Sequence, residues 1–191
     1  MFKVTATVDD RAIRVMLAAG EPIVELAAAS ALNKAAAKAR TQATREISAE
    51  YKVKPQRIIR NRMRLDKADR RRRRNRAQLR FMTRGIPVAI LSGVRDYGDK
   101  RGGVHTPQGN LPDAWMMKSK KGSQQKHVFR RTSKKRLPIQ SQYIHPIKSL
   151  CQFIMWKHMT EEARSVMPEM KRQIILRWNE TISSGRWGHN L

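Results

Sequence analysis

Cysteine is nearly absent from this chain of 191 residues, because Cys151 is the only one. A single thiol cannot form an internal disulfide, and it cannot supply a cysteine-based zinc cage. Its apolar neighbours Leu150, Phe153 and Ile154 predict a buried and unreactive side chain. No apolar run reaches the roughly 18–20 residues that a membrane helix needs, and residues 1–8 are too short and polar for a signal-peptide core. We therefore expect no membrane contact and folding in a cytoplasm.

Acidic residues are also scarce, with 15 Asp and Glu against 41 Lys and Arg, a net charge of +26. Half of this excess lies in residues 52–84, where 15 Lys and Arg face only Asp66 and Asp69, a net of 15 − 2 = +13. Within that zone Arg70–Arg74 and Arg76 give six guanidinium groups in seven residues. Such groups repel one another unless a polyanion lies beside them, which favours a nucleic acid as partner.

Groups that could catalyse a reaction are sparse. The five histidines lack metal-ligand spacing, the carboxylate pairs are adjacent in sequence and so point apart, and no phosphate-cradling glycine motif is present. A nuclease would need acidic metal ligands inside the basic zone, where Asp66 and Asp69 are more simply explained by ion pairs with Arg62 and Arg70. We expect no enzyme, no cofactor and no metal.

The first part of the chain predicts a short strand and a long helix. Apolar residues alternate from Phe2 to Val8, a period of two that is typical of a strand. From Pro22 to Tyr51 the apolar period becomes helical, and Pro22 suits a first helical turn. The apolar stripe is mostly alanine, which lets another backbone approach closely; its expected members are Ile23, Leu26, Ala29, Leu32, Ala36, Ala43, Ile47 and Tyr51.

The middle of the chain predicts short elements separated by irregular segments. A basic helix is expected from Pro55 to Leu65, followed by a basic arm at about 66–78. Strands are expected at 79–82 and 86–91, with Pro87 favouring an edge position. Glycine and proline are dense in residues 92–113, which predicts a mobile loop without regular structure.

The last part predicts a hairpin, a further strand and helices. Residues 115–117 and 127–129 flank a basic tip at 118–123, and a strand is expected at 137–144. Helices follow from Ile147, with Pro168 beginning or kinking the last one, and a loose tail is expected at about 183–191. The whole predicts one α+β domain, residues 1–191, with a long alanine-rich N-terminal helix, a small antiparallel sheet with an extended basic hairpin, and C-terminal helices.

Two sets of residues are candidates for binding. Contacts with the DNA backbone, indifferent to sequence, are expected from Lys52, Lys54, Arg57, Arg60, Arg62, Arg64, Arg70, Arg71, Arg72, Arg73, Arg74, Arg76, Lys118, Lys120 and Lys121. Contacts between subunits are expected from Phe2, Val4, Trp115, Phe129, Trp178 and Trp187. For Trp156 and Trp178 core packing is an open alternative, and it is the favoured one.

Several segments together resemble a known family. The alanine-rich helix around 27–35, the basic second helix at 51–65, His127-Val128-Phe129-Arg130-Arg131, Arg136-Leu137-Pro138-Ile139 and Ile144-His145-Pro146 are similar to the minor tail protein Z family of lambda-like phages and prophages. The resemblance covers about residues 25–150. The chain departs from it by its pentaarginine run and its glycine-rich loop.

The resemblance implies a non-enzymatic virion protein that completes the tail at its head-proximal end, assembled in the host cytoplasm. It implies a homo-oligomeric ring, a hexamer, that touches tail tube or terminator and neck proteins, with double-stranded DNA passing or resting there. A free-standing nucleic-acid-binding protein, ribosomal or nucleoid-like, is the alternative from a different class. A phage nuclease or integrase-like enzyme with metal-dependent cleavage is the third.

Overall fold

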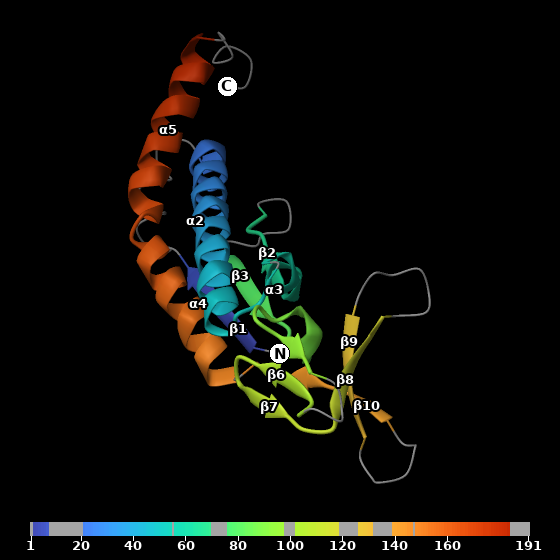
Figure 1. Ribbon diagram of the computed structural model, residues 1–191. Coiled ribbons are helices and arrows are strands. Elements are labelled where there is room, and N and C mark those ends of the chain that lie inside the picture. Colours follow the sequence, from blue (N-terminus) through green and yellow to red (C-terminus); the bar gives the residue numbers. More distant parts are fainter. Residues whose placement is uncertain are drawn as a thin grey trace. The chain divides into compact units, whose positions relative to one another are not determined.

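The computed structural model describes residues 2–7, 21–54, 56–69, 76–97, 102–118, 126–131, 139–146 and 148–183 (Figure 1). The described residues form two compact units. The first comes from Met1–Ala43, Met63–Phe81 and Gln152–Leu191, and the second from Thr44–Arg62 and Met82–Cys151. The mixed helix and sheet content confirms the predicted α+β class. Helix α2 continues from the first unit into the second, and the expectation of a single domain stays a prediction.

Helix α2, Glu21–Glu50, is the long alanine-rich helix that the sequence predicts. Six of its positions are at most 1% exposed: Ala27, Ala31, Ala36, Ala39, Ala43 and Ile47. Spacings of three to five residues put them on one broad face of the helix, and their mostly small side chains let neighbouring elements come close. Leu26 was expected on this stripe, but it is 39% exposed. In an alanine-rich helix the few large residues fix the buried face poorly.

The first unit contains a three-stranded antiparallel sheet. Strands β1 (Phe2–Thr7), β2 (Met63–Asp66) and β3 (Arg76–Phe81) lie in the order β1-β3-β2, which confirms the N-terminal strand. One face of β2 and β3 is core, since Met63, Leu79 and Phe81 are fully buried. Met63 and Leu65 were expected in a helix. Helix α3 ends at Arg62 instead, because Met63 and Leu65 alternate with Arg64 and Asp66 and pair with β3.

Asn33 of α2 fixes the chain where it leaves β2. Its Nδ2 donates to the carbonyl oxygen of Ala68 at 3.0 Å, and the Ala68 amide donates to its Oδ1 at 2.8 Å. Ala68 is buried, so its backbone groups would otherwise lack partners in the core. The start of the predicted arm is therefore held by α2, and its end, residues 76–78, lies in β3.

The second unit contains the short helix α3 (Arg57–Arg62), a 3-10 turn at Val88–Ile90 and three small sheets. Strands β4 (Ile86–Pro87) and β11 (Tyr143–Ile144) form a pair, which gives Pro87 its predicted edge position. Strands β8 (Ala114–Lys118), β9 (Lys126–Arg131) and β10 (Ile139–Ser141) form a sheet in the order β10-β9-β8. The predicted hairpin is confirmed, and the strand expected at 137–144 is two short strands in different sheets.

The segment 92–113 has regular structure, and the expectation that it has none was wrong. Strands β5 (Arg95–Asp96), β6 (Val104–Thr106) and β7 (Gly109–Leu111) form an antiparallel sheet inside it. Gly103 and Gly109 have φ angles of 80° and 140°, which suits the tight turns between these strands. The Leu111 carbonyl oxygen would lie 2.1 Å from a Cβ on Gly103. The glycines shape the turns and do not prevent the strands.

Helices α4 (Lys148–Ala163) and α5 (Val166–Ser183) close the described chain. Pro168 lies in the first turn of α5, where its missing N–H costs no helical hydrogen bond. Cys151 is fully buried as predicted, and burial raises the pKa of its thiol. Trp156 was expected in the core, but it is 56% exposed, because it lies on the outer side of α4 beside Phe153.

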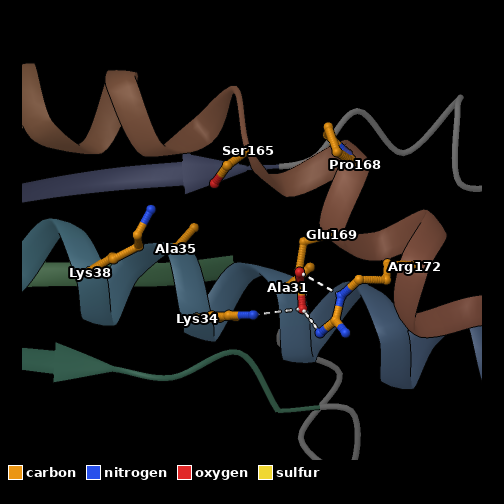
Figure 2. Close-up of a pocket in the computed structure, with 8 residues that line it drawn as sticks. All are labelled: Ala31, Lys34, Ala35, Lys38, Ser165, Pro168, Glu169 and Arg172. Carbon is orange, nitrogen blue, oxygen red and sulfur yellow. Dashed lines mark hydrogen bonds and ion pairs between the residues drawn. The ribbon is translucent and has the colours of Figure 1, made fainter. Parts of the chain in front are cut away.

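Ion pairs join α2 to the C-terminal helices within the first unit. Glu169 accepts from Lys34 at 3.0 Å, from Arg172 at 2.8 Å and 3.1 Å, and from Gln173 at 3.1 Å, and Lys38 pairs with Glu162 at 3.2 Å. Figure 2 shows Lys34 and Arg172 converging on the Glu169 carboxylate. These three residues are among those that line a hollow of about 410 Å³. Three donors hold the pKa of Glu169 well below its usual range, with Arg172 the largest cause. The cations around this hollow are thus already matched by an acid of the chain.

We expect Asn33→Ala to lower the free energy of unfolding by about 1–3 kcal/mol, because two buried backbone groups of Ala68 lose their partner. Urea unfolding measures it. Asn61→Ala, the same change at an exposed helical position, is the matched control for helix propensity. Equal losses in the two variants would show that the contact with Ala68 contributes nothing.

We expect Glu169→Gln to lower the melting temperature at neutral pH, since the neutral amide cannot hold Lys34 and Arg172 as the carboxylate does. The folded-state pKa is lowered, so the carboxylate stabilises fully above the ordinary value of 4.5 and progressively less as the pH falls below it. The gap in melting temperature between wild type and variant should therefore shrink in acid. Glu180→Gln, exposed on the same helix, is the control. A gap independent of pH would assign Glu169 a packing role only.

Candidate nucleic-acid interface

One face of the sheet in the first unit carries a row of cations. The strand register places Lys3 opposite Arg80, and Arg80 opposite Arg64. Arg76, at the start of β3, shares the face of Arg80 because strand side chains alternate. Arg64 and Arg76 are exposed. Like charges directly opposite one another are destabilising, so this face gains stability when an anion lies on it.

Asp66 is the one carboxylate on this face of β2 and β3, and it forms an ion pair with Arg80. The sequence suggested ion pairs of Asp66 and Asp69 with Arg62 and Arg70. Arg62 instead donates to backbone carbonyl oxygens, and Arg70 falls outside the described residues. Arg80 is thus partly neutralised within the sheet. Among the described residues, Arg64 and Arg76 form no ion pair, and they remain available to phosphate.

The pentaarginine run lies between these two strands. Arg70–Arg74 fall outside the described residues, but β2 and β3 are antiparallel neighbours, so the run connects the adjacent ends of a hairpin. The clamp of Asn33 on Ala68 fixes its approach, and Arg76 begins the strand at its exit. The strands on both sides of the run thus belong to the sheet that carries the cationic face.

A second cluster of cations belongs to the second unit. Lys52, Lys54, Arg57 and Arg60 are exposed around the turn that leads from α2 into α3. The turn is rigid: Lys52 has a left-handed φ of 50°, its carbonyl accepts from the Ser92 amide, and Val53 bridges to Leu91. The zone 52–84, continuous in sequence, is therefore divided between two units.

Arg62 has a structural contact that the sequence did not reveal. Its guanidinium donates to the carbonyl oxygens of Arg84 and Gly85, the latter at 2.9 Å. Burial and the neighbouring Arg84 charge lower its pKa. Gly85 itself admits no side chain, since a Cβ there would lie 2.8 Å from that of Tyr143. Arg62 therefore ties the end of α3 to the turn before β4.

The hairpin β8–β9 carries the third cationic group and two predicted contact residues. Lys118 pairs with Lys126 in the strand register, whereas Lys120 and Lys121 lie outside the described residues. Trp115 and Phe129 lie directly opposite each other, with ring centroids 6.5 Å apart. The guanidinium carbon of Arg131 lies 5.5 Å from the centroid of the Trp115 ring.

The remaining predicted contact residues are only partly described. Phe2 and Val4 pair with Phe81 and Leu79 in the register of β1, Trp178 lies in α5, and Trp187 falls outside the described residues. Two further apolar pairs were missed: Phe153 and Trp156 of α4 are each 56% exposed, and Ile175 and Leu176 of α5 are 60% and 43% exposed. The sequence shows that the members of each pair lie near each other on a helix, but it does not show which face of that helix is buried.

The described residues hold no group of three or more His, Cys, Asp or Glu that could bind a metal ion. The closest acidic and histidine neighbours are local pairs, such as His158 with Glu161 at 3.1 Å. The described residues instead present clusters of positive charge and exposed aromatic side chains. This arrangement suits binding of polyanions and of proteins.

Comparison with known proteins gives one match. A sequence model of a family described as prophage minor tail protein Z (GPZ) matches residues 9–178, which includes most of both units. Neither a curated protein nor a solved structure matches. The match extends well beyond residues 25–150, and it confirms the resemblance drawn from the sequence.

We expect Arg64→Gln and Arg76→Gln each to lower the log–log slope of duplex-DNA affinity against salt by about 0.9, the value for one lost phosphate contact. Fluorescence anisotropy over a series of salt concentrations measures it. Lys171→Gln, an exposed cation of α5, is the control for net charge. A slope unchanged in both variants, or lowered equally in the control, would remove this face from the interface.

Proposed function

This chain belongs to the prophage minor tail protein Z family, and we propose that it is the tail completion component at the head-proximal end of the tail. The family makes it a structural protein of the phage tail, and so of the virion. The proposal adds a ring of identical subunits, a hexamer, at the junction of neck and tail, in contact with the end of the genome.

The proposal of genome contact rests on the cationic face of the sheet β1-β3-β2 and on the arginine run that connects β2 to β3. Arg64 and Arg76 are exposed beside the connection that holds Arg70–Arg74, and one acid, Asp66, lies on that face of β2 and β3. No structural feature of the described residues reads base edges, so contact with the phosphate backbone is the mode that fits. Such contact is independent of sequence, as passage or resting of any genome end requires.

Exposed apolar helix surface supports assembly with other proteins. Phe153 and Trp156, with ring centroids 6.3 Å apart, and Ile175 and Leu176 are unusual on the surface of so charged a chain. A ring needs a head-to-tail contact that closes, and tail-tube, terminator and neck proteins would meet its two rims. Among the described residues, no helix is long and apolar enough to cross a membrane.

A free-standing nucleic-acid-binding protein would use the same cations. It would bind as a monomer or dimer and would have no need of the exposed apolar pairs on α4 and α5. The surface of these helices favours the assembled form. We also propose that the chain has no catalytic role.

We expect purified protein to form a particle of six subunits by mass photometry and to bind duplex DNA with a steep salt dependence. Arg70–Arg74→Ser should leave folding and the ring intact while it lowers the log–log salt slope by up to about 4.5, five contacts at about 0.9 each. Arg70–Arg74→Lys keeps the charge and is the matched control.

Two results would contradict the proposal. A wild-type protein that stays monomeric, and that is absent from phage tails, would favour the free-standing binder. A serine variant that binds duplex DNA as tightly as wild type, with the same salt slope, would remove the arginine run from the genome contact.

A further inference from the structure

The sheet β10-β9-β8 presents an aromatic face. Trp115 lies opposite Phe129, and strand alternation puts Met117, His127 and Arg131 on the same side. The His127 and Phe129 ring centroids are 6.1 Å apart, and the Trp115 and Phe129 centroids are 6.5 Å apart. The hairpin thus brings the Trp115 ring of β8 beside the two rings of β9.

This face points away from the core of its unit. The opposite side of the sheet contains Ala114 and Val128, which are 0% and 1% exposed. On the aromatic side Met117 is 45% exposed and Ile139 is 40% exposed, while Trp115 and Phe129 are half-buried. Exposed apolar surface of this kind marks a binding site.

The charge around the face selects the class of ligand. No Asp or Glu occurs from Ala114 to Ile144, and the cations of that segment are Lys118, Lys120, Lys121, Lys126, Arg130, Arg131, Lys134, Lys135 and Arg136. Asp113 directly precedes β8, and Asp96 accepts from the Met116 amide at 2.8 Å on the edge of that strand. The ligand is therefore an anion.

The rings distinguish between anions. An acidic protein would use the cations but would gain little from ring faces, and a base-paired duplex keeps its bases stacked on one another. Unpaired bases stack on Trp and Phe, and their phosphates reach nearby Lys and Arg. Arg131, already over the Trp115 ring, supplies charge at the aromatic site itself.

We propose that Trp115 and Phe129 form a stacking platform for single-stranded nucleic acid, with its phosphates held by Arg131. The inference rests on the proposed genome contact and adds a second mode to it. The sheet of the first unit is proposed to bind the phosphate backbone of duplex DNA, and this platform is proposed to bind unpaired bases. The two modes use different residues, so they are separable by mutation.

The test compares labelled oligothymidylate with a labelled duplex at one salt concentration. Base stacking on an aromatic side chain is strong enough that Trp115→Leu, which keeps an apolar residue in the sheet, should weaken oligothymidylate binding by about tenfold to a hundredfold. Duplex affinity should change by less than about twofold. Tyr97→Leu, at an exposed aromatic side chain outside this sheet, is the matched control and should change neither.

Photocrosslinking of wild-type protein to an iodouridine-containing oligonucleotide gives a readout that needs no variant. Crosslinks at Trp115 or Phe129 support the platform. Crosslinks confined to other segments, or equal effects of Trp115→Leu and Tyr97→Leu, would overturn it. In those cases intact duplex binding would show that the proposed genome contact survives, whereas loss of binding to both nucleic acids in wild type would end both proposals.

Discussion

The repulsion among 41 basic side chains constrains everything else in this protein, because only 15 acids are present to oppose it. The structure uses several of those acids to join elements. Asp66 binds Arg80 across two strands, Glu169 and Glu162 hold α5 and α4 to α2, and Asp96 takes an edge amide of β8. Because these acids form contacts within the fold, few acids remain to neutralise the other basic side chains on the surface. The excess therefore lies on the surface, and under the proposed function the genome neutralises it.

Alanine makes this arrangement possible in the first unit. The buried stripe of α2 contributes little apolar area per residue, so close approach and side-chain contacts must supplement it. Asn33 and Lys34 lie on neighbouring sides of the helix. Asn33 binds Ala68, just before the arginine run, and Lys34 forms an ion pair with Glu169 of α5. The same helix thereby positions a binding segment and secures the helices whose outer surfaces carry Phe153 and Trp156.

Local sequence patterns predicted most of the helices and strands. Where those patterns were ambiguous, pairing with segments distant in sequence determined the structure. Pro22 and the alanine period gave α2, and the alternation around Trp115 and Phe129 gave the hairpin. Met63 and Leu65 fit a helix or a strand equally well, and only pairing with β3 separates the two. Gly103 and Gly109 indicated breaks, yet they form the turns of a sheet. The cationic row and the Arg62 contact join residues distant in sequence, so no local signal contained them. The aromatic face lies within the predicted hairpin, but the sequence did not show which side of that hairpin is exposed.

The central claim is that the exposed cations meet phosphate inside an assembled tail. Electron cryomicroscopy of the particle, at a resolution that places this chain, tests it directly. The account predicts several copies around the channel, with Arg64, Arg76 and the arginine run facing the path of the DNA. Copies on the outer wall, with these side chains turned to solvent and far from the genome, would contradict it.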